Sequence, residues 1–463
     1  MSKIRSGEIG SKGSSHWQQP SRKVRSVLVL VVLISVAARV GIAVSIGNQL
    51  VGLPGTADQL SYHTLAVRMI DRHAFTFDRA WWPATEAGSP TGMWSYLYVF
   101  YLGLIYSIVG VSPLAPRLAQ AVLVGALHPF LAFLLGRRLF GEVAGLVGAA
   151  VTAVYAYFVY YSATLMTEPF FITAILAALY LAIRLVDRSR AADGSATELA
   201  KRALALGAVL GAAVLLRQVF LLFVPVLLIW VWWASGRRIS IAFLPAVVVA
   251  ALILPFTLYN LARFDRFVLL NTNTGYAFFW ANHPIYGTAF EPILPDEMGS
   301  YQDLIPQELR GLDEAALDQE LLRRGIGFIR EDPMRYLRLS LSRISAYFMF
   351  WPSPESGTLS NLGRALSFGL FLPFMVCGLA KTWIERGRAG LSAPVGLLTL
   401  FTVMYSAIHL LSWSLIRYRL PVDAVLVIFG AYGLIEFARR LARTPARVSQ
   451  GIARASATSP TNQ

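Results

Sequence analysis

Residues 26–47 read SVLVLVVLISVAARVGIAVSIG, an apolar run that is long enough to cross a lipid bilayer as a helix. About 20 apolar residues span the hydrocarbon core. The run lacks a clear small-residue cleavage site, so we expect a signal anchor with its amino end in the cytoplasm. Similar runs recur along the 463-residue chain, which is 56% hydrophobic and 14% charged. Soluble domains carry about 25% charged residues. The sequence therefore predicts an all-α polytopic membrane protein.

The charge distribution supports a membrane protein and argues against a nucleic-acid partner. The chain carries 41 Lys and Arg against 26 Asp and Glu, a net charge of +15. These basic residues gather in short connections and tails, as the positive-inside rule requires, and no basic patch is interleaved with exposed aromatics. The single cysteine, Cys377, lies in an apolar run, which excludes a disulfide framework and a cysteine metal site.

The alternation of basic clusters predicts which side each connection occupies. With the basic tail 1–25 and the basic tail 438–463 in the cytoplasm, residues 26–437 form the transmembrane domain. Its ten expected spans are 26–47, 116–136, 143–161, 167–186, 203–216, 218–235, 239–260, 364–384, 391–411 and 419–437. The external segments are a first loop, 48–92, and a large loop, 261–360.

Two further apolar stretches, 93–110 and 334–351, would break this alternation if they spanned the membrane. We expect them to be juxtamembrane or re-entrant helices, which are tolerated where protein or a water-filled cavity covers them. Because 93–110 is long enough to cross, we expect about ten to twelve transmembrane helices in all.

The same alternation places four sets of polar residues on the external face. They are Asp58 with Tyr62 and His63, Glu168, Arg217, and Arg417 with Arg419. An ionisable group costs about 2.5–3.5 kcal/mol at the centre of a membrane helix and less near the interface. One shared polar cavity explains four such sets on one side better than four independent accidents do.

Each of these residues also has a purely structural interpretation. Asp58 could cap the helix that follows it, and Glu168 before Pro169 suits a helix start. Arg217 could be a snorkelling turn arginine, Arg417 and Arg419 could be interface anchors, and His63 could be a packing or hydrogen-bonding group.

Taken together, two acids and several arginines on one face suit transfer from a lipid phosphate. A carboxylate can take a proton from an attacking hydroxyl or amine. Guanidinium groups bind a departing phosphate and stabilise its charge. A lipid-linked donor needs no soluble nucleotide-binding domain, and the sequence contains neither a P-loop nor a strand–Gly-rich turn–helix unit.

The order of these motifs resembles the GT-C membrane glycosyltransferases of the family 39 type. This group includes protein O-mannosyltransferases, the lipid A aminoarabinose transferase and lipopolysaccharide galacturonosyltransferases. The resemblance covers roughly residues 25–440 and rests on DQLSYHTLA at 58–66, SATLMTEPFF at 162–171, VLLRQVF at 214–220, the stretch that ends in ANHP at 281–284, and RYRLP at 417–421.

The resemblance implies a GT-C bundle with its active site on the external, periplasmic face of the cytoplasmic membrane. Asp58 becomes the catalytic base or acceptor-positioning acid, and Glu168 the second acid. Tyr62, His63, Arg217, Arg417, Arg419 and Asn282 become candidates for substrate or phosphate binding. The implied reaction moves a sugar from a polyprenyl-phosphate donor to an envelope lipid, glycan or protein, with inversion.

The chain departs from the family pattern at two positions, and the resemblance leaves the cofactor open. Relatives carry Asp-Glu where this chain has Asp58-Gln59, and some carry Lys-Pro where it has Ser89-Pro90, with Glu86 as one substitute for the missing acid. Metal use varies in the family. No cofactor is certain, and Asp58 and Glu168 could share a Mg or Mn ion.

Three other functions compete with sugar transfer. A transporter or flippase of lipid-linked saccharides would be expected to show paired inverted halves with interrupted helices, and no such repeat is found. A glycan ligase or polymerase would use a longer donor on a similar scaffold. A non-catalytic relative would keep the fold alone.

Overall fold

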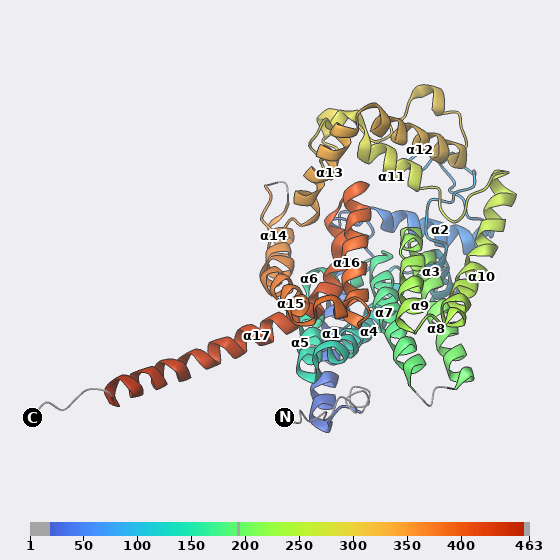
Figure 1. The fold of residues 1–463 in the computed structure, drawn as a ribbon. Helices are drawn as coiled ribbons and strands as arrows, with labels where there is room; N and C mark the ends of the chain where they lie inside the picture. The colour runs from blue at the N-terminus through green and yellow to red at the C-terminus, as the bar shows by residue number, and fades with distance from the viewer. Residues whose placement is uncertain (1–18, 192–194, 355, 458–463) are drawn as a thin grey trace, which may run out of the picture.

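The computed structural model describes residues 19–191, 195–354 and 356–457, and within them the chain is helical (Figure 1). Two isolated β-bridges, Thr76 with Pro90 and Trp81 with Thr85, are the only extended pairing in these residues. The helices are α1 Arg22–Ile46, α2 Asp58–Arg72, α3 Tyr96–Val109, α4 Leu114–Phe140, α5 Glu142–Val154, α6 Ala156–Ser162, α7 Glu168–Arg190, α8 Ala196–Leu216, α9 Val224–Ala234, α10 Ile239–Phe264, α11 Thr274–Asn282, α12 Glu314–Glu331, α13 Pro333–Tyr347, α14 Thr358–Arg364, α15 Leu370–Arg386, α16 Pro394–Leu411 and α17 Ile416–Ala457.

The predicted all-α polytopic fold is confirmed. In the described part of the chain, eight helices are long and apolar enough to cross a membrane, and a ninth results if α5 and α6 count as one bent span. The eight are α1, α4, α7, α8, α10, the run Thr358–Gly390 that contains α14 and α15, α16, and α17 as far as Ala442.

This count is lower than the expected ten to twelve because two apolar stretches form short helices. Residues 218–235 begin with a 3-10 segment, Gln218–Leu222, and the α-helical part, α9, has 11 residues. The stretch 93–110 gives α3, with 14 residues. With the 3-10 segment at about 2.0 Å per residue, the run Gln218–Ala234 extends about 27 Å, close to the roughly 30 Å hydrocarbon core. At 1.5 Å per residue, α3 is about 21 Å long, clearly shorter than that core. The juxtamembrane interpretation of 93–110 stays a prediction.

The expected span 143–161 is broken at Tyr155, where the backbone is extended and α5 meets α6 at 56°. The break frees carbonyl groups at the end of α5, and the buried Arg39 of α1 satisfies two of them. Its guanidinium donates to the Ala153 oxygen at 2.9 Å and to the Thr152 oxygen at 3.1 Å. Because an unsatisfied carbonyl is costly within a bilayer, Arg39 allows the helix to end there.

Small residues let the spanning helices approach closely. A Cβ atom at Gly378 of α15 would clash with the backbone oxygen of Phe429, and one at Gly433 of α17 would clash with that of Phe374. Close backbone contact through small residues is the usual basis of helix association in membranes. The pair of glycines therefore sets the distance between α15 and α17.

A second layer, made of α11, α12 and α13, lies beyond one end of the spanning helices (Figure 1). Glu314 at the start of α12 joins this layer to the first loop. Its buried carboxylate accepts hydrogen bonds from the Gly92 amide at 2.7 Å, from the Thr85 hydroxyl at 2.6 Å and from the Thr272 hydroxyl. The layer and residues 85–92 are thus packed together.

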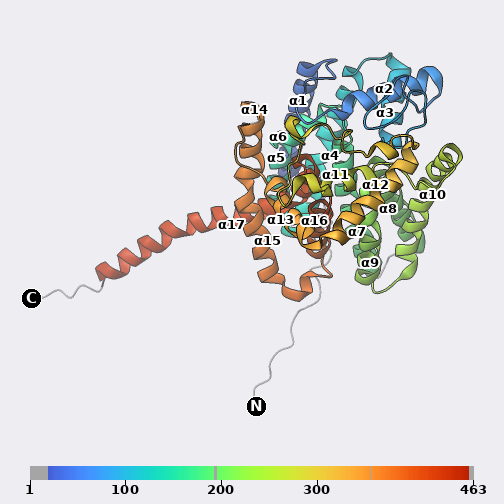
Figure 2. The same cartoon turned by 90° about the horizontal axis from the view of Figure 1, so that it is seen from above.

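The carboxyl-terminal helix α17 runs through the bundle and continues well outside it, as Figures 1 and 2 show. The predicted tail 438–463 is therefore helical as far as Ala457. Of the predicted amino-terminal tail, residues 1–18 lie outside the described residues, and α1 begins at Arg22.

Candidate functional site

Asp58 is the first residue of α2 and is held by an arginine from a distant part of the chain. The residue before it, Ala57, is the N-cap, and no side chain caps the helix. The Asp58 Oδ2 accepts a hydrogen bond from Arg417 Nη1 at 2.7 Å. Asp58 is therefore a partner of Arg417 rather than the helix cap, although an acid in the first turn still suits the helix dipole.

Glu168 is the first residue of α7, and Pro169 follows it in the first turn. Its side chain is 1% exposed. The Oε1 atom accepts a hydrogen bond from Arg217 Nη2 at 2.5 Å and lies 3.9 Å from Arg417 Nε. The Oε2 atom is buried and has no hydrogen-bond partner within the described residues. A buried oxygen without a donor is costly, so Glu168 is positioned to accept one more hydrogen bond.

These contacts join four charged residues in the order Asp58, Arg417, Glu168, Arg217, which we call the Asp58 cluster. Two acids face two arginines, so the formal charges cancel. Three of the four side chains are partly exposed: Asp58 at 23%, Arg417 at 16% and Arg217 at 17%. The cluster is thus largely buried, with part of three side chains accessible to solvent.

Two tyrosines adjoin the cluster. Tyr418 has the guanidinium carbons of Arg217 and Arg417 each 5.2 Å from its ring centre, within the range of cation–π attraction. Tyr62, one turn beyond Asp58, is buried edge-on against Trp94 and Tyr98. Burial, reinforced by the charge of Asp58, raises the pKa of Tyr62, so its hydroxyl stays a neutral donor.

Gln59 follows Asp58 at the position where the family pattern has a second acid. Its side chain connects the segment before Asp58 with the segment before Glu168. Its buried side-chain oxygen accepts from the Leu165 amide at 2.8 Å and from Arg117 Nη2 at 3.0 Å, and its nitrogen donates to the Thr56 hydroxyl at 2.7 Å. An ionised carboxylate at this position has no hydrogen to donate to the Thr56 hydroxyl. Gln59 thus fixes α2 relative to the start of α7.

Three residues proposed for substrate binding point elsewhere. His63 pairs through Nδ1 with the Tyr106 hydroxyl at 2.9 Å, and burial lowers its pKa. Asn282, at the end of α11, accepts a hydrogen bond from Arg343 at 2.8 Å. Arg419 is fully buried and pairs with Asp423 at 2.9 Å. The structure therefore brings none of the three into contact with the Asp58 cluster.

The contacts in the cluster do not fit a metal ion shared by Asp58 and Glu168. Arg417 contacts both carboxylates, and its positive charge occupies the position that such an ion would need. Across the residues described, no group of three or more His, Cys, Asp or Glu side chains has metal-site geometry.

The sequence patterns do not indicate two further residues near the site, and they leave Glu86 open as a substitute acid. Tyr418 packs against both arginines of the cluster, and Arg117 binds Gln59 beside it. Only the position of Tyr418 and Arg117 in apolar surroundings could have indicated them. Glu86 is exposed and lines a different cavity of about 290 Å³, together with Arg263 and Glu314. Glu86 is therefore not a substitute for the missing acid next to Asp58.

The fold of the described residues is a bundle of spanning helices with a helical layer beyond one end. Solved structures share this fold. The archaeal oligosaccharyltransferase AglB from Archaeoglobus fulgidus, in complex with an inhibitory peptide and a dolichol-phosphate, aligns with a TM-score of 0.58 at 17% identity, over 96% of this chain and 52% of that one. ArnT from Cupriavidus metallidurans in the apo state aligns with a TM-score of 0.52 at 14% identity, over 95% and 66%. This chain thus spans about half the length of the archaeal enzyme.

Part of the chain matches a known protein family. Residues 95–261 match the family described as dolichyl-phosphate-mannose-protein mannosyltransferase. This match covers about a third of the chain and agrees over that region with the resemblance carried by the motifs. No curated protein sequence matches the chain.

Proposed function

We propose that this protein is a glycosyltransferase that moves a sugar from a polyprenyl-phosphate donor to an acceptor on the external face of the membrane. The observation that carries the proposal is the Asp58 cluster. It places a partly exposed carboxylate beside two arginines at helix ends. The family of residues 95–261 supports the same class of donor.

Asp58 is the proposed base. The acceptor hydroxyl or amine gives its proton to the Asp58 carboxylate as its lone pair attacks the anomeric carbon. The bond between that carbon and the phosphate oxygen breaks, and polyprenyl phosphate leaves with the bonding electrons. A single displacement inverts the anomeric centre and needs one base, so Glu168 is not required as a nucleophile.

Arg217 and Arg417 are the proposed phosphate ligands. Arg217 uses Nε on the Thr167 hydroxyl at 3.0 Å and Nη2 on Glu168, so its Nη1 remains for an anion. Arg417 Nε is buried and makes no hydrogen bond within the described residues. A departing phosphate supplies acceptor oxygens to both guanidiniums as its charge develops, which is where electrostatic catalysis is strongest.

Glu168 is then a positioning residue. It holds both guanidiniums through one oxygen, and its buried location strengthens these attractions. Because Glu168 and Asp58 together neutralise the arginines, the resting site is stable without substrate. A bound phosphate would compete with the acids for the same donors and release Asp58 toward the acceptor.

The experiment compares cells that lack the protein with cells complemented by the wild-type chain. Mass spectrometry of lipid-linked sugars and envelope glycans should show one accumulated polyprenyl-phosphate sugar and one missing decoration in the deletion strain. The mass of the accumulated donor separates a single sugar from the long glycan of a ligase or polymerase. Unchanged lipid-linked sugars and glycans would contradict the proposal.

A second assay separates a transferase from a flippase. Detergent-solubilised membranes have no sealed compartments. A flippase therefore cannot produce a measurable transfer of lipid-linked saccharide from one side of a membrane to the other in such extracts. Wild-type extracts should still convert the isolated donor into free polyprenyl phosphate and glycosylated acceptor. Loss of all conversion on solubilisation, with export intact in sealed vesicles, would favour the transporter.

A further inference from the structure

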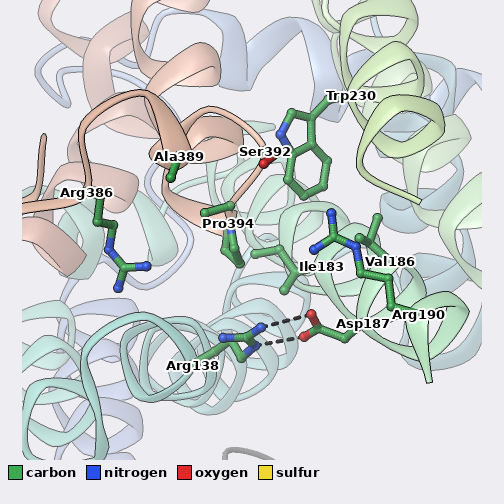
Figure 3. Close-up of a pocket in the computed structure, with 11 residues that line it drawn as sticks. Arg138, Ile183, Val186, Asp187, Arg190, Trp230, Arg386, Ala389, Ser392 and Pro394 are labelled. Atoms are coloured by element: carbon green, nitrogen blue, oxygen red, sulfur yellow. Dashed lines mark hydrogen bonds and ion pairs between the residues drawn. The ribbon is translucent and has the colours of Figure 1, made fainter. Parts of the chain in front are cut away.

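A second polar cavity lies at the opposite end of the bundle from the Asp58 cluster. It has a volume of about 290 Å³ and lies between the ends of α4, α7, α9 and α15 and the start of α16 (Figure 3). Helix α7 links the two sites, since Glu168 begins it and Asp187 and Arg190 lie at its far end. At 1.5 Å per residue, the 19 residues from Glu168 to Asp187 span about 28 Å.

Three arginines from three helices converge on this cavity around one acid. Figure 3 shows Arg138, Arg190 and Arg386 on different sides of it, with Asp187 bound to Arg138. The Arg138–Asp187 pair is bidentate, at 2.8 and 2.9 Å. Among the described residues that line the cavity, three positive charges face one negative charge, in contrast to the neutral Asp58 cluster.

Within the described part of the chain, the contacts that anchor the other two arginines are to backbone oxygens. Arg190 Nε donates to the Ala234 oxygen at 2.6 Å, and Arg386 Nη2 donates to the Leu139 oxygen at 3.1 Å. A carbonyl fixes the position of a guanidinium without cancelling its charge. Helix α16 adds to the positive potential, because it begins at Pro394 on the cavity wall with no side-chain cap.

We propose that this cavity binds the phosphate group of an anionic lipid. Fixed, planar guanidiniums with spare donors match phosphate oxygens. The apolar side chains of Ile183, Val186 and Trp230 share the wall with the arginines, which suits a headgroup whose carbon chain continues along the spanning helices. Basic pockets between membrane helices recognise lipid phosphates in this way. This site is separate from the proposed sugar transfer and does not depend on it.

The test uses the purified full-length protein in zwitterionic detergent and three probes: dioleoyl phosphatidic acid, dioleoyl phosphatidylcholine and inorganic phosphate. Binding is measured by native mass spectrometry and by the shift in apparent Tm. Phosphatidic acid should bind more tightly than phosphatidylcholine, and added salt should weaken it. Stabilisation by inorganic phosphate alone, with no preference for the lipid, would contradict the lipid assignment.

The variants are Arg190→Gln/Arg386→Gln and the control Arg388→Gln. Arg388 is exposed on the same connection as Arg386 but does not line the cavity. The double variant should bind phosphatidic acid at least about tenfold more weakly, since each lost charge-assisted hydrogen bond weakens binding by about that factor, and the control should bind as the wild type does. Equal loss in both would show a nonspecific surface charge effect and overturn the proposal. Arg386→Lys, which keeps the charge, checks that weaker binding does not arise from misfolding.

Discussion

Arg417 is the residue on which the Asp58 cluster depends, because among the described residues it alone contacts both acids. Its Nη1 lies 2.7 Å from Asp58 Oδ2, and its Nε lies 3.9 Å from Glu168 Oε1. The guanidinium also packs over the ring of Tyr418, the next residue in the chain. One guanidinium can bridge two carboxylates because its donors point in several fixed directions. A lysine at this position would offer a single point charge.

We therefore expect Arg417→Lys to keep the fold but to raise the apparent KM for the lipid-linked donor by about tenfold, the usual cost of one lost charged hydrogen bond. The acceptor KM should change little. The control is Arg439→Gln, which removes an exposed charge from the same helix. An unchanged donor KM in Arg417→Lys would argue against a phosphate role.

The sequence could indicate Asp58, Glu168, Arg217 and Arg417, because acids and arginines at the ends of apolar runs are rare and costly. It could not separate Arg417 from Arg419. Two residues apart on a helix, side chains point about 200° apart. Arg417 therefore faces the acids, whereas Arg419 donates to the Tyr347 oxygen at 2.7 Å and to Asp423. The pattern RYR carries no information on which arginine faces which side.

At the scale of elements, the broken helix α5–α6 depends on Arg39. Hydropathy could not reveal this break, because both halves are apolar and the capping group comes from α1, more than 100 residues away. The buried guanidinium also contacts Ser35 and Ser162. Arg39 thus connects α1 with the end of α5 and with α6.

Arg39→Met should lower the apparent Tm by several degrees, since it leaves the Thr152 and Ala153 oxygens without a donor, at roughly 1–3 kcal/mol for each buried group. Arg39→Lys should lower it less. The measurement is intrinsic-fluorescence melting in detergent. If Arg39→Met melted as the wild type does, Arg39 would not be the group that stabilises the break.

Helix α12 provides a pH-dependent contact with α11. Asp318 Oδ1 accepts hydrogen bonds from the Gly275 amide at 2.6 Å and the Tyr276 amide at 3.2 Å. Burial raises the pKa of Asp318 from its ordinary value of 3.8 to about 7. Between these values the folded chain keeps a proton that the unfolded chain has lost, so stability falls as the pH rises toward about 7 and then levels off.

Asp318→Asn should remove this dependence, because the amide oxygen keeps both bonds and carries no charge. The apparent Tm, measured at pH 5 and at pH 8, should differ less in Asp318→Asn than in the wild type. Glu331→Gln, an exposed change at the end of the same helix, should leave the difference as it is. An unaltered pH dependence in Asp318→Asn would assign it to other groups.

For the whole molecule, the apolar runs predicted the class of fold but not the lengths of the helices. The class of fold and most spans could be predicted because apolar runs of bilayer length are rare in soluble chains. The short helices α3 and α9 could not, because a continuous apolar run does not show where a helix begins. In α3 the Ser95 hydroxyl accepts a hydrogen bond from the Tyr98 amide and starts the helix three residues into the run.

The topology gives its own prediction. If α3 does not span the membrane, a reporter fused after Gly110 should lie on the same side as one inserted in the first loop, 48–92. A reporter after Gly236, in the connection between α9 and α10, should lie on the opposite side. Opposite locations for the first two reporters would show that α3 crosses the bilayer.

The most direct test of the central claim is sugar transfer by Asp58→Asn in solubilised membranes. Asp58→Asn should lose about 10²–10⁴-fold in transfer, the usual contribution of a general base, with normal expression, insertion and melting. Asp71→Asn, an exposed change on the same helix, should transfer at the wild-type rate. Full transfer by Asp58→Asn would contradict the assignment of Asp58 as the base.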